Sequence, residues 1–207
     1  MATESHIYRM SSAGGVTSDT RYPNMLTNYG DFGAMQRIAY QVADGTSGYI
    51  TFNNIPQNYQ DLRVVFFPRS ATTGTSTDIY LRLATTGGVI DTGTNYSFTR
   101  LYGNGTSAAS DRNSPQSYIT IGSLPASGAT SGIFGSGTLD ILNYANSTTY
   151  KTSISRSAAD TNGAGYTTLI AGLWRNTAAI TSVQIITNTS FVSGSTVSLY
   201  GIRAGNS

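Results

Sequence analysis

Side chains that could transfer protons or attack a substrate are few in this sequence and lie far apart. The single histidine is His6, close to the start of the chain, and no Gly-x-Ser-x-Gly segment occurs. A Ser-His-Asp triad would need its base delivered from the first few residues, which disfavours that chemistry. Cysteine is absent, so neither thiolate metal sites nor disulfides are expected.

Aspartates are the remaining candidates for acid–base chemistry. Glycoside hydrolysis, for example, uses two carboxyl groups that flank the scissile bond. Asp91, Asp111 and Asp160 fall in turn-rich segments, where an aspartate commonly bonds the local backbone. Asp140 falls inside the strand-like run Thr138–Leu142, which favours an outward-facing or arginine-paired carboxylate. The sequence therefore predicts a protein that is not an enzyme and has no catalytic, metal or cofactor site.

Composition limits the partners further. Charged residues make up 11% of the 207 residues, well below the roughly 25% typical of soluble domains, and the formal net charge is +2. No basic run could neutralise a row of phosphates, so we expect no nucleic-acid partner. No segment approaches the roughly 20 consecutive apolar residues that span a bilayer, so we expect no membrane partner.

Three strand-like runs within Gly165–Arg203 give the strongest signal for secondary structure. Apolar runs of this length, separated by Gly, Pro, Asn and Asp clusters, indicate strands joined by turns. We expect strands near residues 37–43, 49–52, 62–69, 78–84, 97–102, 118–121, 133–142, 150–156, 166–175, 180–187 and 196–203. No helix is expected. This pattern predicts an all-β fold over residues 36–207, an antiparallel two-sheet sandwich that is jelly-roll-like.

Two of these runs allow closer predictions. Leu62–Phe67 is apolar on both faces apart from Arg63, so it should lie centrally in a sheet. Residues 166–175 also have two partly apolar faces, which suits a strand covered on both sides or one whose outer face meets another subunit. Loops on a rigid scaffold often carry partner contacts. The long loops are expected at Ser70–Thr77, Thr86–Tyr96 and Thr106–Gln116.

Residues 1–35 differ from the rest of the chain. They are rich in turn residues and carry isolated apolar side chains that follow neither a strand nor a helix period. This composition is typical either of a disordered tail or of an extended N-terminal arm that docks on a surface. We expect the arm, with partner contacts made by Tyr8, Met10, Tyr22, Met25, Leu26, Tyr29 and Phe32.

Aromatic residues are the main positive feature of the composition, with 14 Tyr, 7 Phe and 1 Trp. Tyrosine and tryptophan are enriched at protein interfaces and also form platforms for sugar rings. Candidate contact residues bordering the loops are Tyr96, Tyr102, Tyr118 and Trp174. For Trp174 core packing is the default interpretation, since its strand neighbours Ile170 and Leu173 are apolar.

Several runs, taken in their order and spacing, resemble a recurrent type of virion structural protein from tailed bacteriophages. The runs are Ile50–Pro56, Tyr59–Arg63, Asn95–Gly105, Leu139–Asn146, Gly172–Ile180 and Val197–Ile202. The resemblance covers about residues 38–204 and carries no catalytic residues. It implies a part of the capsid or of the tail, and it does not choose between them.

Two functions follow from this resemblance as expectations. The first is a capsid decoration (cement) protein, located on the capsid surface of a virion and made in the cytoplasm of a bacterial host. Its partners would be the major capsid protein and other copies of itself, as a homo-oligomer that we expect to be a trimer. The alternative is a tail-fibre or tail-tip module that binds glycans of the host surface through loop tyrosines or Trp174.

Overall fold

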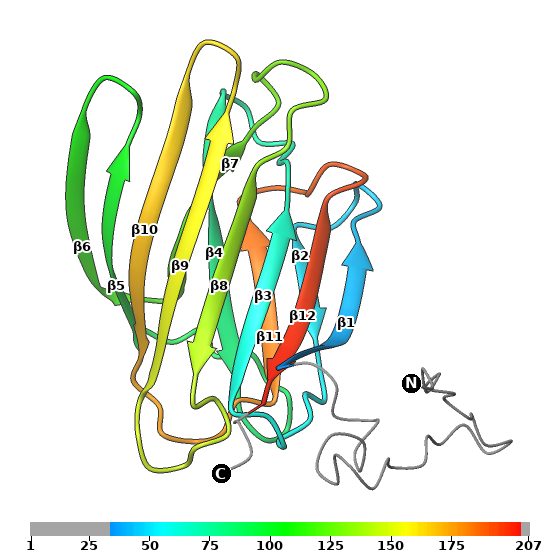
Figure 1. Ribbon diagram of the computed structural model, residues 1–207, viewed down its shortest axis with the longest axis vertical. Coiled ribbons are helices and arrows are strands. Elements are labelled where there is room, and N and C mark those ends of the chain that lie inside the picture. Colours follow the sequence, from blue (N-terminus) through cyan, green and yellow to red (C-terminus); the bar gives the residue numbers. More distant parts are fainter. Residues whose placement is uncertain (1–33, 204–207) are drawn as a thin grey trace, which may run out of the picture. The chain divides into compact units, whose positions relative to one another are not determined.

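The computed structural model describes residues 34–203, in which it contains twelve β-strands and no helix. The strands form two antiparallel sheets that face each other, with the larger one in front in Figure 1. The eight-stranded sheet contains, in spatial order, β1 (Met35–Val42), β12 (Thr196–Ile202), β3 (Asp61–Phe67), β8 (Ser136–Leu142), β9 (Lys151–Asp160), β10 (Gly165–Trp174), β5 (Tyr96–Gly103) and β6 (Ala108–Gln116). The four-stranded sheet contains β2 (Tyr49–Phe52), β11 (Ser182–Thr187), β4 (Ser76–Ala84) and β7 (Ile119–Pro125).

The topology is that of a jelly roll with two added hairpins. The chain changes sheet at each step from β1 to β4 and again from β7 to β8, and β11 and β12 also lie in different sheets. Leaving out the hairpins β5–β6 and β9–β10 reduces the sheets to β1-β12-β3-β8 and β2-β11-β4-β7. This is the eight-strand order of a double-sheet jelly roll. The predicted antiparallel, jelly-roll-like sandwich is therefore confirmed.

The space between the sheets is filled by the inward-facing residues of alternating strands. In β3, Leu62, Val64 and Phe66 are at most 2% exposed, and all three belong to the central apolar cluster. β4 contributes Ile79 and Leu81 to the same cluster. Each such side chain contributes about 1.5–3 kcal/mol through burial. β3 lies between β12 and β8, as its two apolar faces predicted.

Close approach of β7 to the larger sheet depends on small residues. β7 lies against β9 and β10, where the inward side chains of β9 include Ser153. A Cβ atom on Gly172 of β10 would lie 2.5 Å from Oγ of Ser153 and 2.7 Å from Cγ2 of Ile119. Real Cβ atoms do not come this close to other atoms. The absence of a side chain at Gly172 is therefore what lets β7 sit here.

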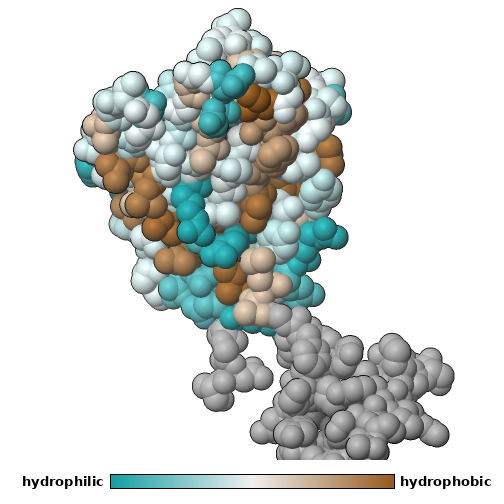
Figure 2. Space-filling view, turned by 45° about the horizontal axis from the view of Figure 1, so that its top comes forward, coloured by the Kyte–Doolittle hydropathy of each residue, from teal (hydrophilic) through white to brown (hydrophobic). Residues whose placement is uncertain are grey.

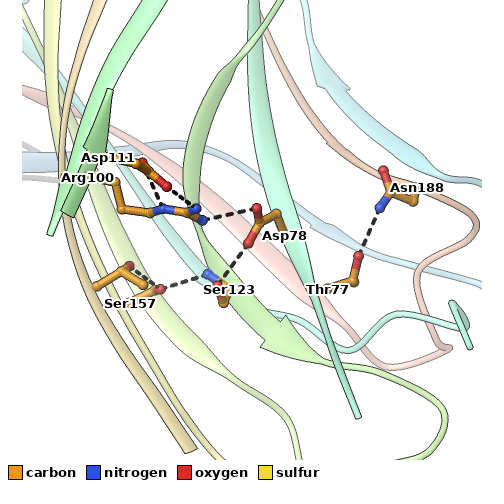
Figure 3. Close-up of polar contacts among 8 residues, drawn as sticks. Thr77, Asp78, Arg100, Asp111, Ser123, Ser157 and Asn188 are labelled. Carbon is orange, nitrogen blue, oxygen red and sulfur yellow. Dashed lines mark hydrogen bonds and ion pairs between the residues drawn. The ribbon is translucent and has the colours of Figure 1, made fainter. Parts of the chain in front are cut away.

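Near the β5–β6 end, polar side chains connect the two sheets (Figure 3). Arg100 of β5 donates to Asp111 of β6 over 2.6 Å and to Asp78 of β4 over 3.1 Å. Asp78 also accepts a bond from the hydroxyl of Ser123 in β7. The backbone N–H of Ser123 in turn donates to Ser157 Oγ in β9. This network ties β4 and β7 to three strands of the larger sheet.

Two expectations from the sequence need correction. Residues Thr106–Gln116 were expected to form a loop, but Ala108–Gln116 is strand β6, which pairs with β5. The first strand begins at Met35, so the last residue assigned to the arm belongs to β1, while the rest of the arm up to residue 33 lies outside the described residues. Across residues 34–203, the structure has no helix of the length and apolarity needed to cross a membrane.

Candidate interaction surface

The outer face of the eight-stranded sheet, which points away from the four-stranded sheet, carries exposed apolar side chains. Leu101 of β5 and Leu169 of β10 are direct cross-strand partners, 54% and 48% exposed. Ile154 of β9 is 46% exposed and pairs with Ala171 of β10. Directly opposed residues have Cβ atoms about 4.5–5.5 Å apart, so these four form one contiguous block. We call Leu101, Ile154, Leu169 and Ala171 the apolar patch.

Strand alternation explains why these residues face outward. In β9, every second residue from Lys151 to Ala159 is buried, and the residues between them are exposed. In β10, Thr168, Ile170 and Trp174 point into the core, which leaves Leu169 on the other side. A shift of either strand by one residue would bury the patch and expose the core, so the core fixes the position of the patch.

A second group of exposed apolar residues lies on the same face, near the opposite edge of the sheet. Tyr40 and Val42 of β1 are 49% and 54% exposed, and Phe67 of β3 is 48% exposed. Phe67 stacks on Phe134 with ring centroids 5.1 Å apart. Figure 2, an oblique view of this side, shows brown apolar areas separated by a teal hydrophilic band. Exposed apolar surface gathered on one sheet face is typical of an interaction site.

Arginines accompany the apolar residues on this face. Arg63 of β3 forms a bidentate pair with Asp140 of β8, with N–O distances of 2.6 and 3.0 Å. The hydrogen bond with Asp140 raises the pKa of Arg63. This pair confirms the interpretation of Asp140 as arginine-paired. Arg112 of β6 and Arg156 of β9 are exposed. Arginine with aromatic and aliphatic side chains is the composition enriched in protein interfaces.

Two of the four candidate loop contacts are fully buried, which corrects the contact role of Tyr96 and confirms core packing for Trp174. Tyr96 and Trp174 are both 0% exposed, and they are cross-strand partners whose rings stack with centroids 6.0 Å apart. The indole N–H of Trp174 donates to Asp91 over 2.7 Å. Burial raises the pKa of Tyr96. Both side chains therefore stabilise the core and the 85–95 loop, and they present no surface to a partner.

The other two candidates are partly exposed. Tyr102 of β5 lies beneath the guanidinium of Arg100, whose Cζ is 4.7 Å from the ring centroid. Tyr118 stands just before β7 and packs against Tyr80 with ring centroids 4.4 Å apart. Neither belongs to the apolar patch. The seven arm candidates, namely Tyr8, Met10, Tyr22, Met25, Leu26, Tyr29 and Phe32, lie outside the described residues.

The aspartates considered for catalysis are held by separate partners. Asp111 pairs with Arg100, and Asp140 pairs with Arg63. Asp91 accepts from Trp174, and Asp160 accepts from the backbone N–H of Asn162. Within residues 34–203, no three or more His, Cys, Asp or Glu side chains gather as a metal site would require.

The sequence pointed to part of this surface. The two apolar faces of residues 166–175 suggested an outer face that meets another subunit, and Leu169 lies on that face. Leu101 and Ile154 were missed because their place beside Leu169 depends on the strand order β9-β10-β5. The sequence does show an outward-facing apolar residue in each of these three strands. It does not show that the three strands are neighbours, because β5 is far from β9 and β10 in the chain.

No protein-family model matches this chain, and neither does any curated protein or solved structure. The fold and the surface thus define the class: an all-β, jelly-roll-like sandwich with an apolar, arginine-bearing outer sheet face.

Proposed function

We propose that this chain is a non-enzymatic virion structural protein of a tailed bacteriophage, and that it acts as a capsid decoration protein. The observation that carries the proposal is the apolar patch on the outer face of the eight-stranded sheet. The resemblance of the runs between about residues 38 and 204 to phage structural proteins supplies the context.

A sheet face suits such an attachment because it is already rigid. The patch residues lie on strands held by neighbours on both sides, so binding orders little additional backbone. Leu101, Ile154 and Leu169 are each about half exposed, and covering them removes apolar surface from water. Exposed Arg112 and Arg156 can pair with carboxylates around the contact.

The N-terminal arm has a complementary role in the proposal. The apolar residues between positions 1 and 33 would contact the major capsid protein and neighbouring copies, which associate as a trimer. Several weak contacts joined by one chain raise the overall affinity above that of each contact. In this proposal the protein lies on the capsid surface. It has a structural function there and no enzymatic one.

Reconstitution tests this function. Capsids of the virus that encodes the chain, prepared without this protein, should bind the purified full-length chain in a saturable number of copies. The double variant I154D/L169D should bind at least tenfold more weakly, because charges would replace half-exposed leucine and isoleucine at the contact. V89D is the matched control, since Val89 is apolar and 82% exposed but lies outside the patch.

The position of the protein on the virion distinguishes a capsid decoration protein from a tail-fibre or tail-tip module. Labelled copies should appear over the head in electron micrographs of complete virions. Label at the tail tip would favour the alternative, and equal capsid binding by I154D/L169D and V89D would remove the patch from the contact. A chain of residues 34–207, which keeps all of β1, should fold with an unchanged unfolding midpoint and bind capsids less tightly than the full chain.

A further inference from the structure

The two sheets have four edge strands, and three of them are protected against pairing with another chain. β6 contains Pro115, which has no N–H to donate. In β7 the backbone N–H of Ser123 already donates to Ser157 Oγ of β9. β2 has four residues, and the carbonyl of Thr51 accepts from the side chain of Gln41 in β1 over 3.1 Å. Proline, short length and covered backbone groups are usual ways in which proteins prevent pairing at sheet edges.

β1 is the exception, and it lies at one edge of the larger sheet (Figure 1). Within residues 34–203 it pairs with β12 alone. It is eight residues long and contains no proline, and Arg37 is its single charged residue. A bulge between Arg37 and Ala39 interrupts the ladder, but residues 39–42 pair with β12 one to one. Beyond the bulge, β1 therefore offers a regular edge to another strand.

The direction of the backbone groups at this edge follows from the pairing just after β1. The N–H of Ala43 donates to the carbonyl of Ser195 at 2.8 Å, and its carbonyl accepts from the N–H of Gly194 at 3.0 Å. Successive residues of an antiparallel strand direct these groups to opposite sides, so those of Val42 and Tyr40 point away from β12. A second strand can bond to them without displacing any bond of the ladder.

The side chains of β1 make this edge self-complementary. Tyr40 and Val42 are 49% and 54% exposed on the outer face of the sheet. Arg37 lies on the same face, because its Cζ is 5.9 Å from the ring centroid of Tyr40. Asp44 is exposed and follows Val42 by two residues, while Ala43 between them packs against the core. One apolar pair therefore has a cation before it and a carboxylate after it.

We propose that β1 pairs antiparallel with β1 of a second copy, about a two-fold axis at Gln41. Tyr40 then lies opposite Val42 of the second copy. The bulge gives residues 37 and 38 a single position in the ladder, so Arg37 lies opposite Asp44 of the second copy. Each contact occurs twice, because a two-fold interface is isologous. Opposite charges on directly opposed residues stabilise paired strands, and like charges destabilise them.

This contact goes beyond the proposed attachment to capsids and does not depend on it. The apolar patch lies on β5, β9 and β10, and three strands, β12, β3 and β8, separate β9 from β1. Each subunit of the proposed trimer has one β1 edge. The two-fold contact therefore joins neighbouring trimers to one another, in addition to any contact that each trimer makes with the capsid.

Sedimentation of the full-length protein over a range of concentrations measures this self-association. The mass of the parent should rise with concentration to at least about twice that of Val42→Pro. Proline removes an N–H on the free side of the strand, which the ladder with β12 does not use, so the variant should keep the unfolding midpoint of the parent. The comparison holds whether the smaller species is a monomer or the proposed trimer.

Two charge variants test the register of the pairing. Arg37→Asp places two carboxylates opposite each other, and Asp44→Arg places two guanidinium groups opposite each other. Each variant alone should associate at least about tenfold more weakly than the parent. An equimolar mixture of the two should recover association, because a mixed pair has opposite charges at both contacts. Asp160→Arg is the matched control, since Asp160 is exposed, is far from β1 in the sheet and, like Asp44, accepts from a backbone N–H two residues ahead.

Three results overturn the proposal. The first is a parent whose mass equals that of Val42→Pro at every concentration, and the second is a mixture that associates as weakly as its separate variants. The third is association that appears only in a chain of residues 34–207, because the preceding residues would then occupy the edge. Capsid binding is scored separately with I154D/L169D, which should lose capsid attachment and keep self-association. Failure of one proposal is therefore distinguished from failure of the other.

Discussion

Trp174 and Asp91, which are 83 positions apart in the chain, are joined by a hydrogen bond of 2.7 Å from the indole N–H to Oδ2. The same carboxylate accepts from the amide of Asn95 at 2.9 Å and from the backbone of Gly93 at 2.8 Å. The hydroxyl of Tyr96 donates to the carbonyl of Asp91. One aspartate thereby fixes the long loop before β5 to the end of β10.

The first prediction concerns the stability that this carboxylate provides. Asp91→Asn should lower the free energy of unfolding by about 1–3 kcal/mol, because an amide cannot accept from Trp174, Asn95 and Gly93 together. Urea unfolding at pH 7 measures the change. Asp44→Asn is the control, since Asp44 accepts bonds from its own turn alone, and it should change stability by less than about 0.5 kcal/mol.

A second prediction follows from the ionisation of Asp91. Partial burial acts to raise its pKa, but hydrogen bonds from Trp174, Asn95 and Gly93 outweigh it and leave the pKa below the ordinary value of 3.8. A carboxyl whose folded pKa is lowered stabilises the fold above its unfolded value, and this contribution is lost as pH falls below about 3.8. Unfolding curves from pH 5 to pH 2 should therefore fall less steeply for Asp91→Asn than for the parent. Parallel curves would contradict this assignment.

The sequence predicts which side chains are buried better than it predicts which distant residues touch. Ile170 and Leu173 indicated that Trp174 belongs to the core, and it does. Nothing in the spacing showed that Asp91 would meet it, because that contact depends on the pairing of β10 with β5. Long-range partners of this kind are set by strand order, whereas local alternation is visible in the sequence.

Strand β6 is a case in which the local sequence pattern gave the wrong secondary structure. Its sequence, Ala108–Gln116, has neither alternating apolar residues nor β-branched ones, and it contains Pro115. These features indicated a loop. The strand forms because it is an edge strand that pairs with β5, and Asp111 meets Arg100 across that ladder. Proline and polar side chains are tolerated at such edges, where they also discourage further pairing.

Tyr96 gives a third prediction, at alkaline pH. Burial raises the pKa of this phenol above 10, which is the ordinary value. An acid whose folded pKa is raised stabilises the fold below its unfolded pKa, and that contribution is lost as pH rises beyond about 10. Tyr96→Phe should be about 1 kcal/mol less stable at pH 7, since it loses the bond to Leu83 N–H, yet its stability should decline less steeply from pH 10 to pH 12. Identical alkaline slopes would contradict the prediction.

The fourth prediction compares two arginines. Arg100 forms ion pairs with two carboxylates, and its side chain is 18% exposed. Arg63 forms an ion pair with one carboxylate, and its side chain is 33% exposed. Arg100→Met should cost about 1–3 kcal/mol, because Asp78 and Asp111 would remain close together without their cation. Arg63→Met should cost less than about 1 kcal/mol, as is usual for exposed pairs. Hydrogen exchange in β6 should also quicken for Arg100→Met alone. Equal losses of stability in the two variants would mean that the network in Figure 3 contributes no more than a single exposed ion pair.

Gly172 gives the last prediction, and it tests the packing of the two sheets. Gly172→Ala would place a methyl group 2.5 Å from Ser153 Oγ and 2.7 Å from Ile119 Cγ2, so β7 must move or the side chains must leave their rotamers. Overpacking of this kind costs about 1–3 kcal/mol. Ala171→Val is the control, because it adds atoms to the neighbouring residue on the exposed face and should change stability by less than about 0.5 kcal/mol.

Removing one of the two obstructing atoms separates steric overlap from other effects of the substitution. In the double variant Gly172→Ala/Ser153→Ala the hydroxyl is gone, while the contact with Ile119 remains. Part of the lost stability should therefore return, with a coupling of at least about 0.5 kcal/mol between the two positions. Additive costs would mean that β7 adjusts without strain, and the close approach of the sheets would then have to depend on residues other than Gly172.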